Sequence, residues 1–543
     1  MKVWTQRSVA LLAAMGASLA FADFDGPAPV AWRWAQSTTA SPAGAPQVMG
    51  NAVYVAVGGR MYGLDKATGN QLWRFPAAEP LEANFRTGGT IGQGLMVAAG
   101  DNKTVYAVDL ATGTLKWQYL APFAIVGSPV IVGNHVVVGM APSSLVSLKA
   151  ETGAPEWDKP LELKGDLYPN MSVFQDNVIV MTNTPTIVSV GAGSKKVNWT
   201  QSAGQLTGNA ATVVYGDTVY VNSGYYLTAL RGATGGKRWD RRVDKLLTYA
   251  PAVADSGVAV VTIDGTIYTF DINGNFMFKK GIDLDSSPVA SPAFVGKLVA
   301  IGTENGILNV IDPKSGDVSF NYVIPPLFKG MRSSGGNGGS SGGGGKSGGL
   351  GLGGSSGGGG GGNESDDEIK YITVAGPAAY AGDTMLVLGK DGSLLAFDKK
   401  QGVDLTAPEV RMAWPNPGEQ ISGQPPLEMV FLIEDAASGV NPSTVAVTIN
   451  GQEYAGVYTR DGYLSIKVSA VGANRPLMDG RAEVKISATD WMGNRVESVF
   501  NLSIDNTLPP SGAPPQNDKA NGPGGGAKGG KGGGKGGGGV GGL

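Results

Sequence analysis

One unit recurs along the chain, and it constrains the fold more than any other feature of the sequence. In this unit a short apolar run meets an Asp, a Thr-Gly pair follows, and a Trp comes a few residues later, as in residues 62–73 and 106–117. The Asp or its equivalent falls at positions 65, 109, 149, 191, 231, 271, 312 and 398. Most copies lie about 40 residues apart, which is the length of a four-stranded β-propeller blade.

Each part of the unit has a physical role in such a blade. The apolar runs are rich in β-branched and aromatic residues, which suit buried strands. The Asp can accept backbone N–H bonds in a hairpin turn, and the Gly can adopt the positive φ that such turns use. The Trp opens the outer strand, where its ring can dock between neighbouring blades. The turn and docking residues that this pattern predicts are Asp65, Gly69, Trp73, Asp109, Gly113, Trp117, Gly153, Trp157, Trp199, Gly235, Trp239, Asp271, Asp312, Gly316, Asp398, Gly402 and Trp34.

The two ends of the repeat array complement each other. The eighth copy reaches Gly402 and then lacks a Trp, whereas residues 30–34 (Val-Ala-Trp-Arg-Trp) read as an outer strand with no inner strands before it. We therefore expect residues 30–36 to complete the last blade beside residues 369–402, because this arrangement removes two open sheet edges. The prediction is an all-β fold with an eight-bladed propeller of four-stranded blades, and seven blades is the alternative.

The repeat resembles the PQQ-like repeat, named after the pyrroloquinoline-quinone enzymes. Several copies also carry a Ser-Pro or Ala-Pro pair before the first strand: Ser41-Pro42, Ser128-Pro129, Ala250-Pro251 and Ser291-Pro292. The resemblance covers residues 30–404. It implies a family of eight-bladed propellers that includes the quinoprotein alcohol dehydrogenases and the non-enzymatic outer-membrane assembly factor BamB.

The first residues predict export. Lys2 and Arg7 precede an apolar run, and Ala20-Phe21-Ala22 supplies an A-x-A cleavage site, so residues 1–22 read as a signal peptide. The run is shorter than the roughly 20 apolar residues that cross a bilayer, so we expect no transmembrane segment. Because the chain has no cysteine, we also expect no lipid anchor. The predicted location is periplasmic, secreted or at the cell surface.

A second domain follows the repeat. Over residues 406–507, alternating apolar runs separated by turns such as Asn450-Gly451 predict roughly seven short strands, the size of an immunoglobulin-like sandwich. The segment resembles bacterial Ig-like domains through residues 435–443 and 488–494. Some relatives bind calcium through carboxylates in these loops, where this chain carries Glu434, Asp435 and Asp490. The interpretation that we favour for these acids is Asx turns that shape the loops.

Two segments differ in composition from both predicted domains. Residues 332–368 are a Gly/Ser-rich insertion, and residues 508–543 form a Gly/Lys-rich tail; such sequences bury too little apolar surface to fold. The predicted organisation is therefore a signal peptide over residues 1–22, a propeller over 23–405 with a disordered insertion at 332–368, an Ig-like sandwich over 406–507, and a disordered tail over 508–543.

Composition restricts the chemistry. Without cysteine there are no thiolate metal sites, and the single histidine, His135, excludes multi-histidine sites. A net charge of −3 argues against nucleic acid as a partner. The quinoprotein dehydrogenases need a metal ion, a catalytic Asp and a Trp at the propeller axis, and no position here matches that set. We predict no catalytic, cofactor-binding or metal-binding residues and no cofactor.

The predicted function is that of a non-enzymatic exported scaffold, expected as a monomer. Its propeller would bind envelope or extracellular proteins, either in a BamB-like outer-membrane assembly role or in envelope adhesion. A PQQ-dependent quinoprotein dehydrogenase is the alternative.

Overall fold

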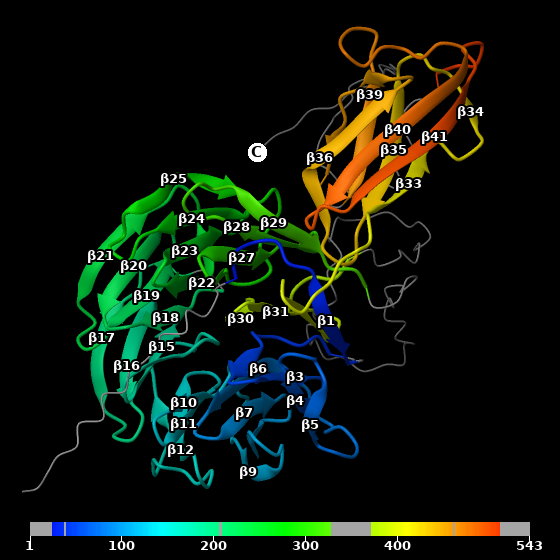
Figure 1. The fold of residues 1–543 in the computed structure, drawn as a ribbon. Helices are drawn as coiled ribbons and strands as arrows, with labels where there is room; N and C mark the ends of the chain where they lie inside the picture. The colour runs from blue at the N-terminus through cyan, green and yellow to red at the C-terminus, as the bar shows by residue number, and fades with distance from the viewer. Residues whose placement is uncertain are drawn as a thin grey trace, which may run out of the picture.

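The computed structural model describes residues 24–36, 38, 40–204, 206, 209–326, 371–459 and 462–510. The predicted signal peptide, the Gly/Ser-rich insertion and the predicted tail from residue 511 onward lie outside these ranges. The described residues form β-strands joined by turns and loops, so the all-β prediction is confirmed. Figure 1 shows the strands in two groups, a ring of small sheets and a separate pair of sheets formed by the C-terminal residues.

Eight four-stranded antiparallel sheets make up the ring in the described part of the chain. The strands of the first four blades are β2 (Gln47–Met49), β3 (Ala52–Val57), β4 (Arg60–Asp65) and β5 (Gln71–Phe75); β6 (Phe85–Gly92), β7 (Leu95–Gly100), β8 (Thr104–Asp109) and β9 (Leu115–Leu120); β10 (Val130–Val132), β11 (His135–Met140), β12 (Ser144–Lys149) and β13 (Leu161–Glu162); and β14 (Ser172–Phe174), β15 (Asn177–Thr182), β16 (Thr186–Gly191) and β17 (Val197–Ser202).

The remaining blades repeat this arrangement. Their strands are β18 (Thr212–Tyr215), β19 (Thr218–Ser223), β20 (Tyr226–Arg231) and β21 (Lys237–Arg242); β22 (Leu247–Ala254), β23 (Gly257–Thr262), β24 (Thr266–Phe270) and β25 (Phe276–Asp283); β26 (Ala293–Val295), β27 (Leu298–Gly302), β28 (Ile307–Ile311) and β29 (Val318–Val323); and β30 (Ala379–Ala381), β31 (Thr384–Leu388), β32 (Ser393–Phe397) and β1 (Val30–Ala35). The fold is therefore a β-propeller.

The core of the propeller lies between blades rather than within them. The middle strands of each blade are apolar on both faces, and these side chains pack against the next blade. In one such cluster Val97 and Ala107 of the second blade meet Val136 and Val138 of the third, and all four are fully buried. Neighbouring blades thus bury each other's faces. Strands that are apolar on both faces, without alternating polar residues, require such cover on both sides.

The first strand closes the ring. β1 pairs antiparallel with β32, with Trp32 opposite Ala396 and Trp34 opposite Leu394. Strands from opposite ends of the propeller segment therefore share one sheet, and the expected closure of the last blade is observed. Arg33 supports it by donating to the Pro325 carbonyl oxygen at 2.9 Å and to the Asp391 carboxylate at 3.3 Å.

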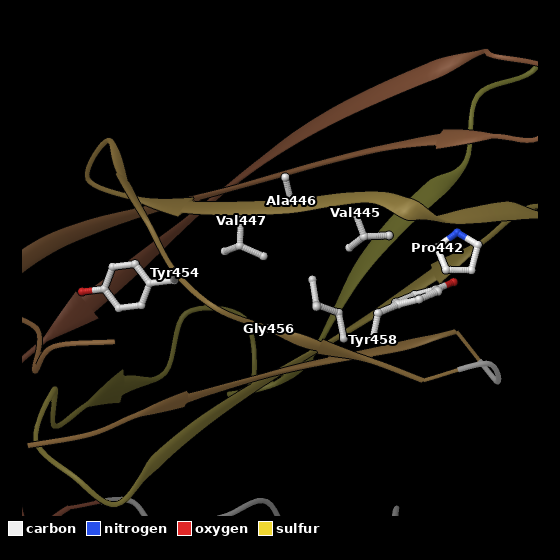
Figure 2. A pocket seen from close by; sticks show the side chains of 8 residues that line it. Pro442, Val445, Ala446, Val447, Tyr454, Gly456 and Tyr458 are labelled. Atoms are coloured by element: carbon white, nitrogen blue, oxygen red, sulfur yellow. The ribbon is translucent and has the colours of Figure 1, made fainter. Parts of the chain in front are cut away.

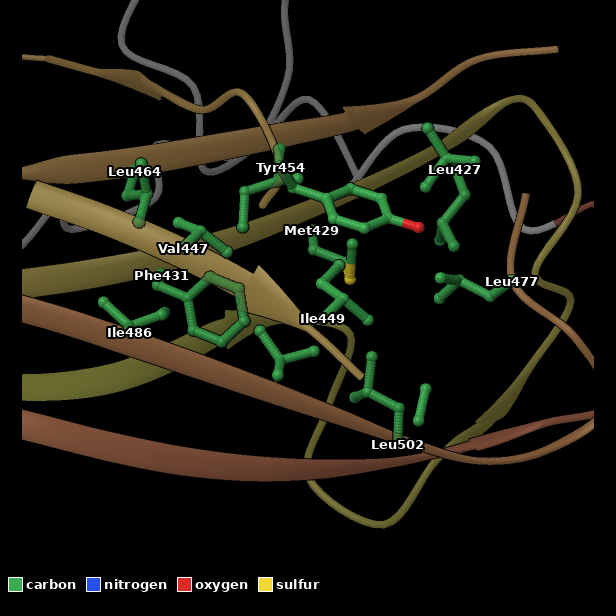
Figure 3. Close-up of a cluster of buried hydrophobic side chains, with 14 of the residues drawn as sticks. Leu427, Met429, Phe431, Val447, Ile449, Tyr454, Leu464, Leu477, Ile486 and Leu502 are labelled. Atoms are coloured by element: carbon green, nitrogen blue, oxygen red, sulfur yellow. The ribbon is translucent and has the colours of Figure 1, made fainter. Parts of the chain in front are cut away.

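The C-terminal residues form two sheets that face each other. One sheet contains β33 (Glu409–Trp414), β35 (Leu427–Glu434), β39 (Tyr463–Val468) and β38 (Val457–Tyr458); the other contains β34 (Gln420–Ile421), β41 (Arg495–Ile504), β40 (Gly480–Asp490), β36 (Val440–Ile449) and β37 (Gln452–Glu453). Figure 3 shows the side chains between them, among which Met429, Phe431 and Ile486 are fully buried. We call this unit the sandwich; its assignment as Ig-like stays a prediction.

The sandwich packs against the last two blades of the propeller. The Tyr322 hydroxyl of β29 donates to the Ala436 carbonyl oxygen at 2.6 Å, and the Val30 N–H of β1 donates to Ala437 at 2.9 Å. The Trp491 ring lies edge-on to Phe320 with the ring centroids 6.1 Å apart. The loop at residues 435–439 and the loop after β40 thus form the junction between the two units.

Candidate functional site

The repeated Trp residues link each blade to the next. In four blades the indole N–H donates to the main-chain carbonyl oxygen one residue after the Asp position of the following blade. The pairs are Trp32 to Lys66 (2.9 Å), Trp73 to Leu110 (3.0 Å), Trp117 to Ala150 (2.7 Å) and Trp199 to Gly232 (2.8 Å). Each pair joins residues more than 30 positions apart, so the Trp acts as an inter-blade clasp.

In most of these turns the Gly lies directly under an aromatic ring of the preceding blade. Gly113 adopts a φ of 69°, and a Cβ on it would lie 2.5 Å from the Trp73 ring. The same relation holds for Gly69 under Trp32, Gly153 under Trp117, Gly235 under Trp199 and Gly316 under Phe278. Gly is therefore required twice, for its positive φ and for the space that the ring occupies. Only the first reason was apparent from the sequence.

The repeated Asp residues shape these turns. Asp65 Oδ1 accepts from the backbone N–H groups of Ala67 at 3.1 Å and Thr68 at 2.9 Å. The same role falls to Asp109, Asp271, Asp312 and Asp398 in their own turns. Each of these carboxylates is thus engaged in a turn of its own blade.

Two positions depart from the expected pattern, the docking position of β1 and the turn position Gly402. Trp32, rather than Trp34, occupies the docking position of β1, because a bulge between Val30 and Trp32 matches the bulge beside Trp73 in β5. Trp34 instead packs edge-on against Tyr62, with the ring centroids 4.8 Å apart. Gly402 does not adopt a positive φ, and a Cβ there would meet Pro29 at 2.7 Å rather than an aromatic ring.

Three other blades vary the clasp. In the sixth blade the ring of Phe278 has no N–H group to donate. The buried Thr269 hydroxyl donates instead to the Pro313 carbonyl oxygen at 2.7 Å. Trp157 is buried, but its N–H has no hydrogen-bond partner in the described structure. Trp239 packs over Gly274. The Arg241 guanidinium lies over the Trp239 ring, 5.6 Å from its centroid. Phe278, Trp157 and Trp239 thus all lie at blade junctions.

Among the described residues, the acids of the propeller loops do not converge on one site. Burial raises the pKa of Asp264, but hydrogen bonds from Lys245 and Thr262 outweigh it, so the pKa lies below its usual range. The Lys245–Asp264 ion pair measures 2.5 Å. Asp166 accepts from the Asn183 side chain at 2.9 Å. His135 Nε2 lies 4.0 Å from the Glu156 carboxylate at the edge of the third blade. These contacts are local to their own loops.

One group of three carboxylates does converge, at the junction between the two units. A carboxylate oxygen from each of Asp404, Asp435 and Asp490 lies within 4.8 Å of the others, and it is the only such group in the described residues. The sequence pointed to Asp435 and Asp490 but missed Asp404, which belongs to the linker after the last blade. Glu434 lies outside the group, because it turns outward to pair with Arg411 at 2.6 Å.

Exposed apolar side chains lie at both ends of the propeller. The end where each outer strand leads into the next blade, here called the connection end, carries loops such as residues 121–129. Because strands alternate in direction, the turns between second and third strands lie at this end too. Leu120 is 70% exposed and Phe123 50% exposed there, and Tyr225, Tyr226 and Ile263 are also exposed.

The sandwich contains a shallow groove of about 300 Å³ between the edges of its two sheets. Figure 2 shows its lining, in which Val445 and Val447 of β36 face Tyr458 and the segment around Gly456. The lining has no Asp, Glu, His, Lys or Arg side chain.

Known proteins resemble this chain over the propeller. The family described as outer membrane protein assembly factor BamB matches residues 22–211 and 183–334, which together exceed half of the chain. The chain belongs to this family. The described residues contain no helix long and apolar enough to cross a membrane.

Curated BamB proteins match at low identity. The BamB of Shewanella oneidensis is 20% identical over 47% of this chain and 70% of its own length. The BamB of Yersinia pestis is 24% identical over 50% of this chain and 74% of its own length.

Solved structures resemble this chain at lower sequence identity. The crystal structure of BamB from Moraxella catarrhalis is 14% identical, with a TM-score of 0.49 over 69% of this chain and 98% of that one. The C-terminal WD40 domain of Sif2 is 12% identical, with a TM-score of 0.48 over 70% of this chain and 99% of that one.

Proposed function

We propose that this protein is a non-enzymatic exported scaffold that binds envelope proteins in outer-membrane protein assembly. The observation that carries the proposal is membership of the BamB family over the propeller. Two features support it. The repeated motif residues are engaged in blade packing, and the one convergent carboxylate group of the described residues lies at the junction with the sandwich rather than within the ring of blades.

The connection end of the propeller is the proposed binding surface. Protein interfaces are enriched in aromatic side chains at their centres, and Phe123, Tyr225 and Tyr226 all lie at this end. The blade-to-blade loops such as residues 121–129 also lie here, whereas the opposite end has tight turns such as Gly50-Asn51 between β2 and β3. Longer loops on a rigid scaffold are where binding residues usually reside.

Substitution at this end tests the proposal. Phe123→Ser combined with Tyr226→Ser should leave the fold intact, because both side chains are at least 43% exposed. After crosslinking in envelope fractions and mass spectrometry, we expect the wild-type protein to recover components of the outer-membrane barrel-assembly machinery. The double variant should recover about tenfold less, as expected when interface aromatic residues are lost.

The matched control is Met49→Ser with Ile272→Ser, at the opposite end and of similar exposure. Equal recovery by the two double variants would contradict the choice of surface. Recovery of no assembly component by the wild-type protein would contradict the function. Reduction of a dye by the protein after reconstitution with pyrroloquinoline quinone and calcium would favour the dehydrogenase instead.

A further inference from the structure

Two neighbouring outer strands carry most of the basic residues on the rim of the propeller. β21 contains four basic residues and one acidic residue, and β25 contains two basic residues and one acidic residue. The other six outer strands contain at most one basic residue each. Two of them, β17 and β29, are uncharged and still complete four-stranded blades, so folding does not require this charge.

Neighbouring acids neutralise only part of this charge. Lys237 forms an ion pair with Asp240 at 2.5 Å, and Arg238 forms one with Asp217. The Arg241 guanidinium instead donates to main-chain carbonyl oxygens in the turn before β25. Carbonyl oxygens fix the position of this side chain, but they carry no formal charge, so its positive charge remains.

Three further basic side chains of these strands are exposed. They are Arg242 at the end of β21 and Lys279 and Lys280 in β25, and they stay exposed with the sandwich in place. Within the described ranges, no ion pair joins any of the three to a carboxylate. Figure 1 shows β21 and β25 at the outer margin of the ring. We call Arg241, Arg242, Lys279 and Lys280 the basic rim.

An exposed aromatic ring lies close to these cations in the chain. Phe276 begins β25, three residues before Lys279, and is 39% exposed although its ring packs against Phe270 with the centroids 4.6 Å apart. Surfaces that lie on a membrane combine basic side chains, which meet the headgroup phosphates, with aromatic or aliphatic side chains that enter the boundary of the acyl chains. The rim of β25 combines these two kinds of side chain.

The composition of the basic rim favours a lipid surface over a protein partner. Protein interfaces are depleted in Lys relative to the rest of the protein surface. Clusters of Lys and Arg, by contrast, bind anionic headgroups through charge alone and need no fixed geometry. The exposed lysines of β25, on the outer margin of the ring, fit the second case. We propose that the basic rim, together with Phe276, binds the anionic headgroups of a phospholipid membrane.

Binding through the rim would place the propeller edge-on to the membrane and leave the connection end open to protein partners. This proposal goes beyond the proposed function and does not rest on it, because Lys279 and Lys280 lie on a different strand from Phe123 and Tyr226. Only Arg242 approaches the connection end, where it lies opposite Tyr226. The variant that tests the membrane contact therefore leaves Arg242 unchanged.

Sedimentation with lipid vesicles tests the proposal. The full-length protein should bind vesicles that contain phosphatidylglycerol at least about tenfold more strongly than vesicles of phosphatidylcholine alone, because each basic side chain near an anionic surface strengthens binding about fivefold. This binding should fall steeply when the salt concentration rises from about 0.05 M to about 0.5 M, because salt screens exposed charges.

Lys279→Gln combined with Lys280→Gln should weaken binding to the phosphatidylglycerol vesicles at least about tenfold. The matched control is Lys159→Gln with Lys297→Gln, which removes the same charge from exposed lysines of the third and seventh blades. The control should bind within about twofold of the wild-type protein, because neither lysine lies on β21 or β25. Both double variants should fold, because all four side chains are exposed.

Three results would overturn the membrane contact: equal wild-type binding to neutral and anionic vesicles, an equal loss of binding in the two double variants, or binding to immobilised polyglutamate without binding to anionic vesicles. The last result would indicate an acidic protein partner. Because the vesicles contain no protein, failure of this test leaves the proposed function untouched. Failure to recover assembly components would in turn leave the vesicle result untouched.

Discussion

At the scale of single residues, the repeat joins the turn of one blade to the Trp of the preceding blade. Gly113 closes the turn of one blade and receives the Trp73 ring of the preceding blade. The Trp73 N–H then donates to Leu110 in that same turn. One Gly and one Trp therefore join two blades through shape and a hydrogen bond together, which explains why both recur at fixed positions.

Gly113→Ala should destabilise the propeller by about 2–4 kcal/mol, through both the positive φ and the overlap with Trp73. The control is Gly94→Ala, since Gly94 has a φ of 72° but nothing within 4 Å of a Cβ. That change should lower the free energy of unfolding by only about 1 kcal/mol. Chemical denaturation of both variants measures the difference, and equal losses would show that the Trp contact is unimportant.

At the scale of elements, β1 is the strand on which ring closure depends. It is the outer strand of the last blade, and its partner β32 lies more than 350 residues away in sequence. Two rings dock from it onto the first blade, Trp32 over Gly69 and Trp34 on Tyr62. Without β1 the last and first blades lose their shared contacts, and β32 becomes an open edge.

Removal of residues 24–36 should therefore lower the melting temperature by about 10 °C or more, or abolish cooperative unfolding, because a whole blade junction is lost. A synthetic peptide of residues 24–40 added in trans should restore part of the loss by pairing with β32. An unchanged melting temperature in the truncated protein would exclude a closing role for β1.

The predictability of these elements differs for physical reasons. Turn chemistry at Asp65 and Gly69 is local, so the repeat alone predicts it. The choice of Trp32 over Trp34 depends on a bulge opposite β32, and the distant partner strand is not visible in a short motif. The group of Asp404 with Asp435 and Asp490 depends on how the linker leaves the last blade, so the sequence placed only two of its three members.

At the scale of the whole molecule, the propeller and the sandwich share one junction. Phe320 and Tyr322 of the seventh blade and Val30 of β1 meet two loops of the sandwich. Trp491 also donates to the Asn321 side chain at 3.3 Å. Contacts of ring, hydroxyl and backbone together favour a defined orientation of the two units over free movement.

Trp491→Ala should loosen this orientation, because the ring contact and the hydrogen bond to Asn321 are both lost. X-ray scattering should show a larger radius of gyration, while circular dichroism of the two units stays the same. Met492→Ala, in the same loop with 36% of the side chain exposed, is the control. A radius of gyration that is unchanged in Trp491→Ala would mean that other contacts hold the junction.

The sequence by itself determined the blade unit, its period and the all-β class, because strand patterns and turn residues act over a few neighbouring positions. It also indicated that the first and last repeats complement each other. Only the tertiary structure decided which Trp docks, where Asp404 lies and how the sandwich meets the propeller. These features arise where segments far apart in the chain come together, and their register is set by packing rather than by local preference.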